Sequence, residues 1–291
     1  MKRNGLRSSK KCCANKRERK GKLMTKIPKI IHYCWFGGAP IPEKDKACIE
    51  SWRKFCPDYE IIEWNESNYD IAKNRYMKEA YDVKKWGFVP DYARLDIVYT
   101  HGGIYLDTDV EIIRNMDPLL EDEAFMGFED GKFVALGLGF GAAKGNQHIK
   151  TMRDVYEGVS FINPDGSFNT LPSPHYTTEY LLEKGLKQND AFQQIEGISI
   201  YPKAYFCPRD YYTGAMNLTE NSYTIHHYNA SWLSDKEKQN YERKLHLIER
   251  YGKTIGTGLH YVLSVPDILK RNDIGGLIGK VLKKIGGIFR K

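Results

Sequence analysis

Apolar positions in the first half of the chain follow two periods, one typical of buried strands and one typical of amphipathic helices. An apolar run predicts a strand at 27–36, and the patterns at 59–64 and 104–113 predict two more. Helical spacing predicts helices over 43–55, 75–86 and 90–101, the last opened by Pro90 and ended by Gly102-Gly103. Because strands and helices alternate with short connections, the pattern predicts an α/β domain with helices on both faces of the sheet.

The second half of the chain mixes strand and helix signals, so we expect a mixed sheet. Apolar runs on either side of Glu129-Asp130-Gly131-Lys132 predict a hairpin over 125–136. Further patterns predict a strand over 222–229 and helices from Asn146, over 176–186 and from Ser234, where Glu237 completes a capping box. No linker stands out within 27–252, so we expect a single domain there. A basic disordered tail at 1–26 and a linker with a basic amphipathic helix at 253–291 would flank it.

The net charge of +7 is unevenly distributed along the chain. Residues 1–26 carry +10 and residues 268–291 carry +6, which leaves −9 on residues 27–267. A nucleic-acid enzyme more often carries positive charge on its folded body, so we expect no nucleic-acid partner. An acidic body suits a metal site that handles diphosphates through a cation.

The C-terminal segment has the pattern of a basic amphipathic helix. Apolar residues recur there with a period of 3.6, at Ile274, Leu277, Ile278, Val281, Leu282, Ile285, Ile288 and Phe289. Lysines and arginines fill much of the remainder, which favours binding to an anionic membrane surface. The alternative is a terminal helix packed on the body.

The sequence contains no apolar run of the roughly 20 residues that a transmembrane helix needs. We therefore expect a cytoplasmic protein, peripheral on the inner face of the membrane.

The most informative segment is 101–111, His-Gly-Gly-Ile-Tyr-Leu-Asp-Thr-Asp-Val-Glu. In an extended chain, Tyr105, Asp107 and Asp109 point to the same side. Two carboxylates at the end of a buried strand repel each other, and Mg²⁺ or Mn²⁺ would remove that cost. One alternative is a solvated strand end with two surface acids. Another is an aspartyl-phosphate phosphatase, which is disfavoured because Glu111 stands where Thr or Val is expected.

Residues 89–109 strongly resemble the sugar-nucleotide-binding region of glycosyltransferase family 32. That family contains DXD-motif transferases of bacterial capsule and surface polysaccharide synthesis and fungal Golgi mannosyltransferases, and clostridial glucosylating toxins carry a related stretch. Its pattern, an Asp and an Arg three apart and then Gly-Gly-x-Tyr-x-Asp-x-Asp, is filled here from Asp91 to Asp109. Residues 27–38 are similar to the family's first strand, and residues 226–232 match its closing motif. The resemblance covers roughly 27–235.

The resemblance implies a GT-A fold with roles for particular residues. Asp109 would ligate the metal directly, and Asp107 would bind donor ribose or sugar hydroxyls. Asp91 and Arg94 would hold the donor sugar and its diphosphate; the alternative for this pair is an ion pair on a helix surface. Asp107, Asp109 and Arg94 form the expected catalytic set, and Tyr105 is expected beside the donor.

Five further residues are assigned by the same resemblance. Trp35 would stack on the nucleobase, with a core tryptophan as the alternative. Ser231 and Trp232 would contact the diphosphate. His226 and His227 face opposite sides of a predicted strand, and either could complete the metal shell.

The function implied is that of a retaining glycosyltransferase. It would move a sugar from a nucleoside-diphosphate donor, UDP-hexose first and GDP-mannose second, to a hydroxyl of a glycan or lipid-linked acceptor. Mn²⁺ or Mg²⁺ would stabilise the leaving diphosphate. Residues 135–142 and 172–178 are expected as acceptor loops, or as ordinary loops. The alternative function is a catalytically inactive, membrane-docked module that binds glycans or nucleotide sugars.

Overall fold

The computed structural model describes residues 25–229 and 235–270. Helices and strands alternate along this part of the chain. In order they are β1 (Ile30–Cys34), α1 (Glu43–Phe55), β2 (Glu60–Trp64), η1 (Ile71–Lys73), α2 (Arg75–Asp82), α3 (Pro90–His101), β3 (Gly103–Tyr105), β4 (Val110–Ile112), η2 (Asp117–Glu121), β5 (Ala124–Phe128), β6 (Val134–Ala135), β7 (Phe140–Ala142), α4 (Gln147–Asp154), η3 (Val155–Glu157), α5 (Ser173–Glu183), β8 (Gln193–Ile195), β9 (Ile198–Tyr201), α6 (Lys203–Phe206), β10 (Thr224–His226) and α7 (Asp235–Lys270).

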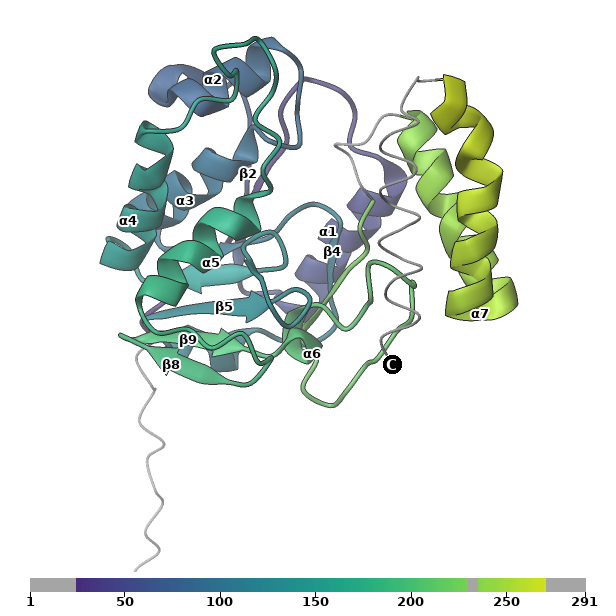
Figure 1. Cartoon of the computed structure of the whole chain (residues 1–291). Coiled ribbons are helices and arrows are strands. Elements are labelled where there is room, and N and C mark those ends of the chain that lie inside the picture. Colours follow the sequence, from purple (N-terminus) through teal and green to yellow (C-terminus); the bar gives the residue numbers. More distant parts are fainter. Residues whose placement is uncertain (1–24, 230–234, 271–291) are drawn as a thin grey trace, which may run out of the picture.

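The centre of the molecule is a mixed sheet with the strand order β2-β1-β3-β7-β5-β9-β8, and β6 pairs with β5 (Figure 1). Strands β2, β1, β3, β5 and β9 run in one direction, while β7, β8 and β6 run against them. The carboxyl ends of β1, β3 and β5 therefore share one edge of the sheet, the edge at which ligands of such sheets bind.

Each face of the sheet contributes to its own apolar core, because side chains alternate along every strand. On one face, Ile31 and Tyr33 of β1 pack with Trp52 of α1. On the other face, Tyr105 of β3 packs with α2, α3, α4 and α5. The expected mixed sheet with helices on both faces is confirmed.

The prediction of one strand over 104–113 is wrong, since the chain leaves the sheet after Tyr105. The backbone N–H of Asp107 donates to Gly137 O (3.1 Å), and that of Val110 donates to Asp107 O (3.1 Å), which closes a turn. β4 then pairs antiparallel with β10 in a separate two-stranded sheet. The D-x-D motif thus lies in the link between two sheets.

The C-terminal part of the described chain is a helical hairpin (Figure 1). α7 is interrupted at Gly252, whose φ of 77° lies in the left-handed region. The two segments lie against each other, because a Cβ on Gly256 would overlap the backbone of Leu247 and Ile248. Residues 253–270, within the segment expected as a linker and helix, are helical.

The described residues include no helix that is long and apolar enough to cross a membrane. Nearly all of the expected N-terminal tail (1–24), together with Ser234 and the amphipathic pattern from Ile274, lies outside the described residues.

Candidate functional site

Two carboxylates and one imidazole meet where the two sheets adjoin. The pairing of β4 with β10 sets Val110 opposite His226, and the backbone N–H of His227 donates to Asp109 O (2.9 Å). Asp107, Asp109 and His226 each offer a ligand atom, and these atoms all lie within 4.8 Å of one another. Segments more than 100 residues apart in sequence therefore build one cluster.

Asp109 and His226 form a buried pair in which each side chain favours the charged form of the other. His226 Nε2 lies 3.2 Å from Asp109 Oδ1. Burial disfavours the charge on Asp109, but His226 outweighs this and lowers the pKa of the carboxyl. Burial also disfavours a charged His226, but Asp109 raises the pKa of the imidazole well above its ordinary value.

The cluster fits a divalent cation. His226 turns its Nε2 atom toward the Asp109 carboxylate, so a neutral imidazole can offer that atom to a cation. The Asp107 side chain is 30% exposed and can be reached from solvent. Two carboxylates suit Mg²⁺ or Mn²⁺, and an imidazole beside them is acceptable to Mn²⁺.

His227 lies on the other side of β10. Its Nε2 atom is 2.8 Å from Glu111 Oε2, and both side chains are partly exposed. The sequence left open which of the two histidines could complete the metal shell. In the structure, His226 lies beside the two aspartates, and His227 does not.

Asp91 and Arg94 approach the cluster from α3. Arg94 Nη2 lies 3.0 Å from Asp91 Oδ1 and 3.6 Å from Asp107 Oδ1. Both residues of the α3 pair are buried, so the alternative of a helix-surface ion pair is excluded. Burial raises the pKa of Asp91 to about 6, against the opposing charge of Arg94. Tyr105 is also buried. The Arg94 Cζ atom lies 5.2 Å from the centre of the Tyr105 ring, so the ring packs against the guanidinium.

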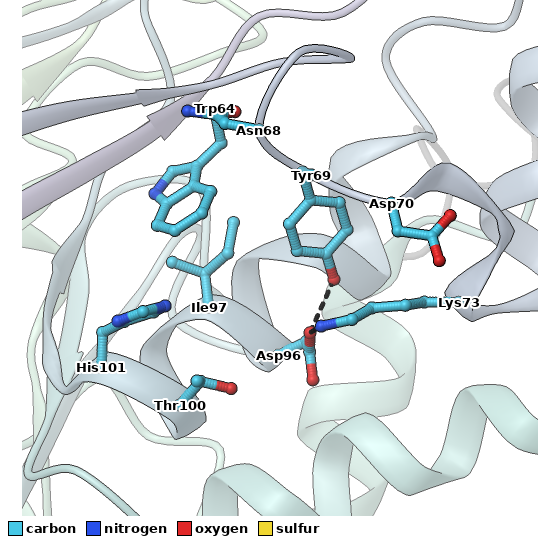
Figure 2. A pocket seen from close by; sticks show the side chains of 9 residues that line it. All are labelled: Trp64, Asn68, Tyr69, Asp70, Lys73, Asp96, Ile97, Thr100 and His101. Atoms are coloured by element: carbon cyan, nitrogen blue, oxygen red, sulfur yellow. Dashed lines mark hydrogen bonds and ion pairs between the residues drawn. The ribbon is translucent and has the colours of Figure 1, made fainter.

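The opposite side of α3 is anchored by a second carboxylate, Asp96. Figure 2 shows Tyr69 and Lys73 pointing at Asp96, and both donate to Oδ2 at 2.8 Å. Arg153 donates to Oδ1 at 3.1 Å. Tyr69, Lys73 and Asp96 border a hollow of about 370 Å³, in which Lys73 and Asp96 are paired with each other. The network therefore ties α3, the helix that carries Arg94, to η1 and α4.

Trp35 lies just after β1 at the edge of a larger groove. The groove measures about 650 Å³ and is also lined by Asp45, His227, Asn229 and Tyr241. Trp35 is only partly buried, and its indole N–H donates to Ala39 O. Trp35 both packs against the core and borders the groove. Ser231 and Trp232 lie outside the described residues.

Gly137 has a role that the sequence analysis missed. A Cβ at this position would overlap the Asp107 carboxylate and lie 3.3 Å from Arg94 Nη1. Residues 135–142 are buried and run from β6 through the turn that contains Gly137 into β7, next to the Asp107 carboxylate. In the second expected acceptor loop, 172–178, residues 173–178 form the first part of α5, so this segment is helical and not a loop. The missed signal was the Gly-Leu-Gly at 137–139, since glycine in an apolar run marks close approach of another group.

Comparison with known proteins gives one family match. Residues 42–126 match the model described as "Glycosyltransferase sugar-binding region containing DXD motif". This region contains Asp91, Arg94, Asp107 and Asp109, while His226 lies beyond it.

Curated relatives match over limited parts of their length. Inositol phosphoceramide mannosyltransferase 3 of Schizosaccharomyces pombe is 36% identical over 112 residues, which cover 34% of this chain and 29% of the relative. The chain thus spans about a third of the length of the first curated relatives it matches. The uncharacterized glycosyltransferase L373 of Acanthamoeba polyphaga mimivirus is 29% identical and matches over 57% of this chain and 58% of its own. Among solved structures, PaToxG glycosyltransferase aligns with a TM-score of 0.44 and 21% identity, over 55% of this chain and 70% of that one.

Gly137→Ala should disturb the site more than the fold. The added methyl group must displace the Asp107 carboxylate, so we expect Mn²⁺ binding to weaken by about tenfold or more. Calorimetric titration with Mn²⁺ measures this. Gly158→Ala is the matched control, because a Cβ there makes only an ordinary contact of 3.8 Å. Equal Mn²⁺ affinity in the two variants would contradict the close approach of Gly137 to the site.

Proposed function

We propose that this protein is a glycosyltransferase, because residues 42–126 match a glycosyltransferase sugar-binding region with a DXD motif. It would transfer a hexose from a nucleoside-diphosphate sugar to a hydroxyl group of an acceptor. The observation that carries the proposal is the convergence of Asp107, Asp109 and His226 beside the buried Arg94. The site thus combines a set of cation ligands with a fixed positive charge. Both would stabilise the negative charge of a departing diphosphate.

Each residue near the donor has a separate task in this proposal. A divalent cation held by Asp107, Asp109 and His226 would neutralise charge on the leaving diphosphate. Arg94 offers a fork of donors to phosphate or sugar oxygens, and its orientation is fixed by Asp91 and Tyr105. Trp35 would stack on the base at the adjoining groove.

We propose that the reaction retains the configuration of the anomeric carbon. The acceptor hydroxyl oxygen would bond to the anomeric carbon as the bond from that carbon to the diphosphate breaks. The hydroxyl proton would pass to a departing phosphate oxygen on the same face. This route needs no covalent nucleophile, and the described residues around Asp107 offer stabilisers of a leaving group.

The donor is proposed to be a UDP-hexose, on the family resemblance. GDP-mannose is the second candidate, and the mannosyltransferases among the curated relatives support it. The acceptor is proposed to be a glycan or a lipid-linked molecule. Relatives named for inositol phosphoceramide mannosylation favour the lipid-linked kind.

An anionic membrane surface is proposed as a further partner, at the cytoplasmic face. The second segment of α7 supports this with an exposed apolar stripe at spacing i, i+4, i+7 and i+8. Exposed fractions are 61% for Ile255, 37% for Leu259, 66% for Val262 and 51% for Leu263. The +6 charge of residues 268–291 follows directly in sequence and complements anionic lipids.

A nucleotide-sugar hydrolysis panel with Mn²⁺ tests the activity. We expect slow release of one nucleotide without acceptor, abolished by EDTA and reduced about 10²–10³-fold in Asp109→Asn, because the ligand carboxylate is lost. Liquid chromatography of the released nucleotide identifies the donor. No release from any donor, with nucleotide-sugar binding still measurable, would favour the inactive binding module.

The stereochemical course can be read from the product. We expect the product to keep the anomeric configuration of the donor, and the one-bond ¹³C–¹H NMR coupling at the anomeric carbon distinguishes the two configurations. Inversion, or a glycosyl-enzyme adduct trapped in mass spectrometry, would rule out the proposed route.

Cosedimentation with liposomes tests the membrane surface. The variant Ile255→Ser/Val262→Ser/Leu263→Ser should bind phosphatidylserine-containing vesicles about tenfold more weakly, because three apolar side chains no longer enter the interface. Leu171→Ser/Leu182→Ser/Phe192→Ser is the control, with similarly exposed residues (41%, 42% and 52%) far from α7 in sequence. Unchanged vesicle binding with an altered mass in light scattering would instead assign the stripe to contact between copies.

A further inference from the structure

Asp45 lies in the first turn of α1 and contacts both halves of the candidate cation site. Its carboxylate is buried, with the residue 4% exposed. Oδ2 accepts a hydrogen bond from Thr108 Oγ1 (2.9 Å), and Oδ1 accepts one from Asn229 Nδ2 (2.6 Å). Thr108 stands between Asp107 and Asp109 in sequence. One side chain thus joins the D-x-D turn to the segment that follows β10.

Asn229 completes the connection through its backbone. Its N–H donates to Asp109 Oδ2 at 2.8 Å. The preceding residue, Tyr228, has a φ of 55°, in the left-handed region that a bulky side chain rarely adopts. This backbone conformation turns the chain back toward Asp109 after His226. Such conformations persist where surrounding contacts fix them, and the bond from Asn229 to Asp45 is one of those contacts.

The rest of α1 supports the same link. Trp52 Nε1 donates to Val110 O (2.7 Å), and the backbone N–H of Ile112 donates to Ser51 Oγ (2.9 Å). β4 is therefore held by β10 on one edge and by α1 side chains on the other. Asp45 extends this contact from β4 to the D-x-D turn itself.

We infer that Asp45 is a positioning residue, which fixes Thr108 and Asn229 so that the carboxylates and His226 stay at coordinating distance. This role rests on the proposed function, because it presumes that the cluster holds a cation. Each Asp45 oxygen accepts a hydrogen bond from a protein donor, and Asp45 is not part of the described set whose ligand atoms converge, so it acts through its neighbours. Residues that orient metal ligands in this way typically change affinity about 10–100-fold when removed.

The test measures Mn²⁺ binding to the full chain without donor, from the electron paramagnetic resonance signal of free Mn²⁺. Asp45→Ala should bind Mn²⁺ about 10–100-fold more weakly. Asp45→Asn should stay within roughly threefold of the wild type. Its amide oxygen can accept from Asn229 and its NH₂ group can donate to the Thr108 hydroxyl, so both bonds survive without the charge.

Two further variants separate positioning from general stability. Asp117→Ala removes a carboxylate that accepts from Tyr59 (2.9 Å) and Lys29 (2.8 Å) outside the site. It should lower the melting temperature and leave Mn²⁺ affinity unchanged. Thr108→Val removes one of the two bonds to Asp45 with little change in shape, and should weaken Mn²⁺ binding about three- to tenfold. It serves where Asp45→Ala does not fold.

The outcomes are distinct. Wild-type Mn²⁺ affinity in both Asp45→Ala and Thr108→Val overturns the positioning role and leaves the proposed function standing. Loss in Asp45→Asn as large as in Asp45→Ala shows that the charge acts directly, which also overturns it. A wild-type protein that binds no Mn²⁺ removes the cation from the proposed function, and the role of Asp45 falls with it.

Discussion

The site depends on the pairing of two strands of three residues each, β4 and β10. Neither strand belongs to the main sheet, and neither is stable in isolation, because a two-stranded ribbon this short buries little. The body of the protein supplies the missing stability through Trp52 and Ser51 of α1. Once the pair is formed, its register sets His226 opposite Val110 and so brings the imidazole next to Asp109.

The second constraint is the burial of charge on α3. Asp91 and Arg94 face the site, whereas Asp96 faces the network with Tyr69 and Lys73. Buried ion pairs contribute little net stability, because desolvation offsets their attraction. A helix that carries three buried charged residues on two faces is therefore better explained by a need to fix Arg94 than by stability. The same burial raises the pKa of Asp91 to about 6.

Two glycines near the site stand where other parts of the chain approach their backbone closely. Asp107 lies against Gly137, and a Cβ on Gly103 would meet Ile30 O at 2.8 Å. Gly103 allows β3 to approach β1, and Gly137 leaves room for the Asp107 carboxylate beside Arg94. Residues 27–267 carry a net charge of −9, which raises the local concentration of cations around the cluster.

The sequence by itself determined the local elements and the residue types of the site. Periodicity predicted α1 and α3 with their observed bounds, and the D-x-D motif identified Asp107 and Asp109, because both signals are local. Tertiary structure decided the rest. The strand predicted over 104–113 leaves the sheet after Tyr105, and His226 rather than His227 lies beside the aspartates. Asp45 and Gly137 also lie at the D-x-D turn. These outcomes depend on pairing between segments far apart in sequence, and the period of a single segment carries no information about its partner.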